Sequence, residues 1–291
     1  MPRPLRPRRS VLYVPAANAR AMAKAAQLPC DAVIYDLEDA VAGEAKAEAR
    51  GLLEAHFAEA APTPGQERVI RVNLRAGAPD GDDIAAAARC APDAVLLPKV
   101  EEPQTLLEAR WMLDASGGGN IRLWAMIETP LGIVDLGEIA RAGAPDAVGL
   151  DCLVAGVNDL AKETNLPLPE ARPTIQHWLS AIVIHARAFG MDALDGVYND
   201  FRDEAGFAAE CRQGVLGGFD GKTLIHPSQI AAANAAFSPA EDAIREARAI
   251  IAAFEDPENA GKGVLAIDGR MVERLHADMA RKLLARAALD A

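Results

Sequence analysis

Short apolar runs alternate with alanine-rich stretches eight times between residues 10 and 236. The runs contain aliphatic and β-branched residues without polar alternation, which is typical of strands in a parallel sheet covered on both faces. We predict strands at residues 11–15, 32–37, 69–73, 94–99, 122–128, 150–156, 193–198 and 221–225. The other stretches predict helices at about residues 19–27, 45–60, 82–90, 103–113, 133–141, 174–189, 201–216 and 227–236. Eight successive βα units predict an α/β fold, the TIM (β/α)8 barrel.

The residues outside this pattern are predicted to form a tail and an extension. Residues 1–9 are rich in arginine and proline, so we expect a flexible N-terminal tail. No apolar stretch of about 7 to 15 residues follows them, as a signal peptide would require. The barrel would span residues 10–237. Residues 238–291 would form a C-terminal helical extension, with one helix at 239–254 capped by Ser238 and another at 269–288. Such an extension needs a surface to pack on, either its own barrel or a neighbouring subunit.

Composition and charge restrict the partners of the chain. Hydrophobic residues make up 51% of the sequence and aromatic residues only 4%, which suits alanine-lined helices around aliphatic strands. The formal net charge of -12 disfavours a nucleic acid or an anionic membrane, because phosphate binding depends on concentrated Lys and Arg. No run of about 20 apolar residues predicts a transmembrane helix. The four cysteines are far apart, and we interpret them as reduced core thiols of a cytoplasmic protein.

Charged side chains stand at the predicted strand ends. Glu128 follows the apolar run of RLWAMIETP, and the carboxyl ends of all strands in a parallel barrel open onto one face. An ionisable group there is a candidate for chemistry. The same face would hold Asp36, Glu38, Asp39, Arg71, Asn73, Lys99 and Asp159. Each has a structural alternative: Asp39 and Asp159 could cap the following helices, and Arg71 could neutralise a neighbouring carboxylate.

Several carboxylates beside two cations predict a bound counter-ion. Mg²⁺ commonly takes one or two protein carboxylates and keeps several waters or substrate oxygens. Glu128 and Asp159 are the best placed pair for it. Arg71, two residues before Asn73, could hold a carboxylate or an enolate with two parallel hydrogen bonds.

Other catalytic chemistries have weaker support. The five histidines form no H-E-x-x-H pattern, which argues against zinc, and neither a G-x-S-x-G elbow nor a G-x-G-x-x-G or Walker loop is present. A Schiff base on Lys99 would require a desolvated lysine, and the nearby Glu101 and Glu102 argue against one.

The order of the motifs resembles a known family. It begins with RSVLYVPAANARAMAKA at Arg9 and DAVIYDLEDAVAGEAKAEAR, and then follow IRVN, PKVEEP, IETPLGI, GVNDLA, KTLIHPSQI and DGRMVERLH. Together they resemble the citrate lyase β-subunit-like family, which groups with malyl-CoA and citramalyl-CoA lyases in the HpcH/HpaI aldolase superfamily. The resemblance covers nearly the whole chain.

This resemblance implies a trimeric or hexameric TIM-barrel enzyme that binds Mg²⁺ and acts on CoA thioesters of small hydroxy acids. It implies Glu128 and Asp159 as metal ligands. Arg71, Glu128, Asn158 and Asp159 would contact the substrate, with Arg71 at the developing enolate. The positions that match CoA contacts are Tyr13, Lys24, Ile225 and His226.

The chain departs from the family pattern at two places. Where relatives often show P-G-x-R, it has Pro15-Ala16-Ala17-Asn18, and Arg20 is the nearest substitute for the missing arginine. The family motif M-I-D-x-P supplies an aspartate acid or base to a neighbouring subunit's site. Here Glu273 stands in that place and the proline is absent. Proton transfer is sensitive to shifts of about 1 Å, so Glu273 could transfer the proton, transfer it slowly, or mark a different substrate.

Three activities are consistent with these observations. The first is a Mg²⁺-dependent Claisen-type lyase for a 3-hydroxyacyl-CoA, with thioester hydrolysis as its nearest variant and Glu273 as the acid or base. The second is a CoA-independent pyruvate aldolase, but those enzymes have a D-x-E-H motif where this chain has Asp36-Leu37-Glu38-Asp39. The third is a subunit that acts on an acyl-carrier protein, as in the citrate lyase complex.

Overall fold

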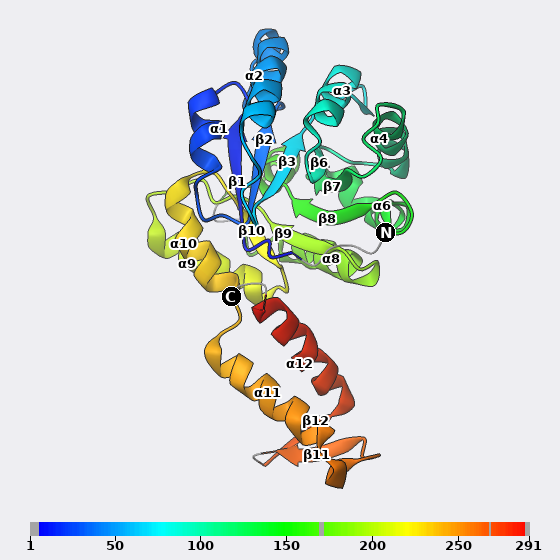
Figure 1. Cartoon of the computed structure of the whole chain (residues 1–291), viewed down its shortest axis with the longest axis vertical. Coiled ribbons are helices and arrows are strands. Elements are labelled where there is room, and N and C mark those ends of the chain that lie inside the picture. The colour runs from blue at the N-terminus through cyan, green and yellow to red at the C-terminus, as the bar shows by residue number, and fades with distance from the viewer. Residues whose placement is uncertain (1–5, 169–171, 268, 289–291) are drawn as a thin grey trace. The chain divides into compact units, whose positions relative to one another are not determined.

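The computed structural model describes residues 6–168, 172–267 and 269–288. The chain divides into two compact units, residues 1–236 and residues 237–291 (Figure 1). Each unit is described by itself.

The first unit is a closed barrel of eight parallel strands (Figure 1). The strands are β1 (Ser10–Pro15), β2 (Ala32–Asp36), β3 (Glu67–Arg71), β6 (Ala94–Leu97), β7 (Arg122–Ile127), β8 (Leu150–Ala155), β9 (Asp192–Asp195) and β10 (Gly221–Leu224). Each strand pairs with the next of these, and β10 closes the barrel on β1 with Ser10 opposite Lys222. The predicted TIM barrel is therefore confirmed.

Helices follow the strands and surround them (Figure 1). They are α1 (Ala19–Ala25), α2 (Lys46–Glu59), α3 (Gly81–Cys90), α4 (Pro103–Ala115), α5 (Pro130–Val134), α6 (Leu136–Gly143), α7 (Val157–Glu163), α8 (Gln176–Ala188), α9 (Glu204–Leu216) and α10 (Ile230–Phe237). Short 3-10 turns lie at Gly43–Ala45 and Pro227–Gln229. The helix predicted at residues 133–141 is two helices, α5 and α6, that meet at Asp135. The predicted helix at 201–216 begins later, because the Asp203 side chain caps it by accepting the N–H of Gly206.

Buried, mostly aliphatic side chains from the strands fill the interior of the barrel. Val11, Ile34, Val69, Trp124 and Val154 belong to this core, with further aliphatic residues from the remaining strands. Burying each such side chain contributes about 1.5–3 kcal/mol relative to exposure. The four cysteines are buried and form no disulfide, as predicted for core thiols.

The predicted N-terminal tail ends earlier than residue 9. Residues 1–5 lie outside the described residues, but Arg8 is only 2% exposed. Its guanidinium donates to both carboxylate oxygens of Glu67 and to Asp192, each at 2.7–2.8 Å, and it stacks over the Trp124 ring at 4.9 Å. Arg8 thus belongs to the barrel, because the carboxylates at the strand starts would otherwise be buried without a counter-charge.

The second unit is a helical hairpin with a small sheet. It consists of α11 (Glu241–Glu255), a 3-10 turn (Pro257–Asn259), the antiparallel strands β11 (Val264–Ile267) and β12 (Arg270–Glu273), and α12 (Arg274–Ala287). The predicted start of the last helix at residue 269 was wrong, because Val272 pairs with Leu265 and both are buried. Ser238 is not the helix cap; Ala240 occupies that position without a side-chain hydrogen bond. Among the described residues, no helix combines the length and apolarity needed to cross a bilayer.

Candidate active site

Glu128 is the first residue after β7, where the predicted strand run ends in a carboxylate. Its side chain is 1% exposed, although it is ionisable. The backbone N–H of Lys99, beyond the neighbouring strand β6, donates to Glu128 Oε1 at 2.8 Å. Gly156 leaves room for this side chain, since a Cβ at that position would come 2.3 Å from Cβ of Glu128. The site therefore depends on both neighbours of β7.

A cavity of about 400 Å³ lies where these strands end. The lining residues that carry polar groups or were singled out from the sequence are Tyr13, Asp36, Asp39, Arg71, Glu128, Asn158, Asp159, Thr223 and Ile225. They come from β1, β2, β3, β7, the start of α7, and the end of β10. Of the eight strand-end groups expected on one face, five line this cavity, whereas Glu38, Asn73 and Lys99 do not. The roles of all eight in binding and catalysis stay predictions.

Arg71 is the centre of an ionic cluster in this cavity. Its Nε and Nη2 donate to the two oxygens of Asp36 at 2.7 and 2.6 Å, and Nη1 lies 2.9 Å from Glu38 Oε2. The guanidinium also lies over the Tyr13 ring, 5.1 Å from its centroid. The structural alternative considered for Arg71, neutralising its neighbours, is realised here. Its fixed orientation still leaves it facing the cavity.

Burial changes the proton affinity of Glu128. Burial, together with a smaller contribution from the charge of Asp159, raises the pKa of that carboxyl to about 8, although the hydrogen bond from Lys99 and the charge of Arg71 lower it. A pKa in this range means that the carboxylate lacks a cation strong enough to keep it ionised. A metal ion at this position would supply one.

The donor set suits Mg²⁺ better than a metal that needs a complete protein cage. No group of three or more His, Cys, Asp and Glu arranged to hold a metal occurs in the described part of the chain. Two carboxylates, the buried Glu128 and the half-buried Asp159 in the first turn of α7, are available. Mg²⁺ accepts such a pair because it retains waters and substrate oxygens.

Several predicted site residues lie outside the cavity lining. Lys24 is exposed on α1, and His226 stacks on Phe201 with ring centroids 4.4 Å apart. Asn73 is buried and serves the backbone: its amide donates to the Leu37 carbonyl at 2.9 Å. Glu273 belongs to the second unit, where its backbone N–H donates to His276 Nδ1 at 2.9 Å.

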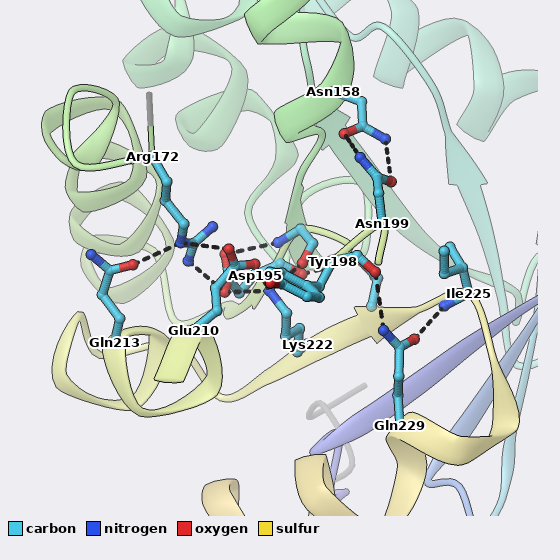
Figure 2. Close-up of polar contacts among 12 residues, drawn as sticks. Asn158, Arg172, Asp195, Tyr198, Asn199, Glu210, Gln213, Lys222, Ile225 and Gln229 are labelled. Carbon is cyan, nitrogen blue, oxygen red and sulfur yellow. Dashed lines mark hydrogen bonds and ion pairs between the residues drawn. The ribbon is translucent and has the colours of Figure 1, made fainter. Parts of the chain in front are cut away.

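A hydrogen-bonded chain of amides at the cavity rim was missed from the sequence. Gln229 Oε1 accepts the N–H groups of Ile225 and His226 at 3.1 and 3.2 Å, and its Nε2 donates to the Tyr198 carbonyl at 3.0 Å (Figure 2). The next residue, Asn199, exchanges two amide hydrogen bonds with Asn158 (Figure 2). The chain joins the loops after β8, β9 and β10. The glutamine in IHPSQ was the available signal.

A buried ionic cluster beneath the rim was also missed. Lys222 is fully buried, and its Nζ donates to Asp195 at 2.8 Å and Glu210 at 2.6 Å (Figure 2). Arg172 contacts the same two carboxylates at 2.7 and 3.2 Å. Burial alone would raise the pKa of Asp195, but the two cations outweigh it and hold that pKa below its ordinary value. These four residues are spread over 50 positions of the sequence, from Arg172 to Lys222, so no local motif marks them.

The fold is a TIM barrel with eight parallel strands. Two carboxylates and an ion-paired arginine lie at the carboxyl ends of these strands, where TIM-barrel enzymes have their active sites. Comparison with known families identifies it further. The HpcH/HpaI aldolase/citrate lyase family profile matches residues 9–227, and the chain belongs to this family. The family resemblance predicted from the motifs is therefore confirmed.

Similar proteins of the same family align with almost the whole chain. A (3S)-malyl-CoA thioesterase of Cereibacter sphaeroides is 43% identical over 281 residues, which span 97% of this chain and 95% of that protein. The mitochondrial citramalyl-CoA lyase of Homo sapiens is 33% identical, with 92% of this chain and 82% of that protein covered. Among solved structures, CitE of Mycobacterium tuberculosis in complex with magnesium, acetoacetate and coenzyme A has a TM-score of 0.76 and 31% identity, covering 97% and 98% of the two chains.

Proposed function

We propose that this protein is a Mg²⁺-dependent carbon-carbon lyase that acts on the CoA thioester of a 3-hydroxy acid such as malyl-CoA or citramalyl-CoA. The observation that carries the proposal is the buried Glu128 in one cavity with Asp159 and Arg71. The names of the relatives support the substrate class, and magnesium and coenzyme A are bound in the related CitE structure.

Glu128 and Asp159 would hold the metal ion. When bound, Mg²⁺ supplies Lewis-acid polarisation of the hydroxyl and carboxylate oxygens of the acid half. Glu128 contributes a buried carboxylate at the end of β7, and Asp159 contributes a half-buried one from the first turn of α7, which follows the neighbouring strand β8. Asn158, adjacent to Asp159 and lining the same cavity, would contact the substrate.

Arg71 would stabilise the charge that moves onto the thioester oxygen as the carbon-carbon bond breaks. Asp36 holds the guanidinium plane with two short hydrogen bonds, so the group needs little reorganisation during the reaction. This fixed orientation is the reason that lysine would be a poor substitute.

The proton at the enolate carbon would come from Glu273 of a neighbouring subunit in a homotrimer or hexamer. Tyr13, Lys24, Ile225 and His226 would contact the CoA portion. Of these, Tyr13 and Ile225 line the cavity, which supports the assignment of the thioester end to this side. Four buried cysteines that form no disulfide suit a reducing compartment, and we place the protein in the cytoplasm.

Product analysis with malyl-CoA tests the reaction. A lyase releases glyoxylate and acetyl-CoA, and the enolate takes one proton. The expected result is formation of both products with Mg²⁺ and none with excess EDTA. Glu128→Gln should abolish this turnover, and full activity of that variant would refute the metal assignment.

Thioester hydrolysis is a second candidate, favoured by the name of the 43% identical relative. In that reaction water cleaves the thioester, and malate and free CoA are formed. The same assay separates the two, because only hydrolysis releases a free thiol and only the lyase releases an aldehyde. Formation of malate and CoA without glyoxylate would replace the lyase proposal by hydrolysis.

A further inference from the structure

Lys99 lies in the turn after β6 and has a backbone conformation that is rare for a residue with a side chain. Its φ angle is 44°, in the left-handed region that favours glycine. β6 ends at Leu97, and Val100 beyond the turn donates its N–H to the carbonyl of Met126 on β7. The left-handed turn therefore removes the Lys99 N–H from the strand ladder.

This N–H is instead directed to the carboxylate of Glu128. It donates to Oε1 at 2.8 Å, while the other oxygen, Oε2, lies against Gly156 so closely that a Cβ there would come 2.7 Å from it. Gly156 immediately precedes α7, the helix that carries Asp159. One oxygen of Glu128 is thus held by Lys99, and the other lies on the α7 side of the cavity.

The side chain of Lys99 holds the same turn from the other direction. Its Nζ donates to Glu38 Oε1 at 2.8 Å, and Glu38 Oε2 lies 2.9 Å from Arg71. Glu38 follows β2, so the ion pair ties the turn after β6 to a different strand end. Since both oxygens of Glu38 are engaged, the pair opposes relaxation of Lys99 to a more usual φ angle.

We propose that Lys99 is a positioning residue for the metal-binding carboxylate: its ion pair with Glu38 maintains the left-handed turn whose N–H orients Glu128 toward Asp159. This inference rests on the proposed function only in treating Glu128 as a metal ligand. Lys99 then acts through Glu128 and does not contact the ion. Removing such an outer contact typically weakens metal binding by about 10- to 100-fold.

Three substitutions separate the backbone conformation from the charge. Lys99→Ala removes the ammonium group but keeps the Cβ that disfavours a positive φ angle. Lys99→Gly removes the ammonium group and that restriction together, and Lys99→Arg keeps a cation that can reach Glu38. Mg²⁺ affinity of the purified full chain, measured by calorimetry without substrate, is the readout.

The expected order follows from these differences. Lys99→Ala should weaken Mg²⁺ binding by about tenfold or more. Lys99→Gly should stay within about threefold of the unaltered protein, because glycine adopts the turn without the ion pair. Lys99→Arg should restore nearly full affinity. Unchanged affinity in Lys99→Ala overturns the proposal, as does an equal loss in Lys99→Ala and Lys99→Gly.

Metal-free crystal structures of the two variants provide a test that needs neither metal binding nor turnover. The distance from the residue 99 nitrogen to Glu128 Oε1 should stay near 2.8 Å in Lys99→Gly and be lost in Lys99→Ala. Glu128 in its original place in Lys99→Ala contradicts the inference. If the unaltered protein binds no Mg²⁺, the proposed metal site fails while these structures still decide the role of Lys99. If it binds Mg²⁺ without turnover, only the proposed reaction fails.

Discussion

The side chain of Glu128 is almost completely buried, and this burial changes the pH at which its carboxyl group loses a proton. Burial raises its pKa from 4.5 to about 8. Between these two pH values the folded protein retains a proton that the unfolded chain releases, so the free energy of unfolding falls as pH rises. The fall amounts to about 1.4 kcal/mol per pH unit across the interval and levels off above it.

We therefore predict that Glu128→Gln flattens the pH dependence of stability. Urea unfolding in EDTA, from pH 5 to pH 9, would show the free energy of unfolding of the unaltered protein decreasing more steeply than that of the variant. The difference arises because glutamine has no proton to release. Parallel curves for the two proteins would show that Glu128 titrates normally.

Arg71 provides the second prediction at this scale. Arg71→Lys keeps a positive charge but cannot form the paired hydrogen bonds to Asp36. We expect kcat/KM for the CoA thioester to fall by on the order of 100-fold, with Mg²⁺ affinity nearly unchanged. Arg75→Lys is the control, since Arg75 is exposed and pairs with Asp80 outside the cavity lining. Equal kinetics in Arg71→Lys and the control would remove Arg71 from the reaction.

Among the elements, the strands were predictable because each is an apolar run buried on both faces. All eight were anticipated, and most of their ends lay one to three residues too far along the chain. The sequence did not predict the short hairpin of β4 (Leu74–Arg75) and β5 (Ala78–Pro79). Its turn uses left-handed Ala76 and Gly77, a pair that lacks the usual Asn-Gly signal. The candidate site followed from the strands, because parallel strand ends meet at one face.

Residues of the loops could not be predicted in the same way. The partners of Gln229 depend on how the loops after β8, β9 and β10 come together, which no local pattern specifies. Likewise, nothing in the sequence around Lys222 indicates its partners, and only the closed barrel brings it to Asp195 and Glu210. Such contacts are set by tertiary packing.

The amide chain yields a prediction about these loops. Gln229→Leu removes three hydrogen bonds at a position that is 2% exposed. The loops after β9 and β10 should then separate, and KM for the CoA thioester should rise about tenfold. Gln104→Leu, which removes an exposed contact with Glu108 on α4, should leave KM unchanged. A lower unfolding midpoint with an unaltered KM in Gln229→Leu would show that these amide hydrogen bonds stabilise the fold without affecting substrate binding.

At the scale of the whole barrel, ion pairs link the strands at the end opposite the cavity. Arg8 pairs there with the buried Glu67 and the partly exposed Asp192, and its removal takes a counter-charge from both carboxylates. Arg8→Met should lower the free energy of unfolding by about 3–5 kcal/mol. Arg6→Met removes a half-exposed pair with Asp93 and should cost no more than about 1 kcal/mol. Urea unfolding measures both, and similar values would mean that Arg8 does not stabilise the barrel.

Glu128 and Asp159 together should bind one metal ion. Electron paramagnetic resonance of Mn²⁺, used in place of Mg²⁺, counts the ions bound per chain and gives their affinity. Asp39→Asn is a matched control, because Asp39 lines the same cavity but is exposed. We expect one bound ion in the unaltered protein and in Asp39→Asn, and loss of that ion in both Glu128→Gln and Asp159→Asn. Undiminished binding in the last two variants would contradict it.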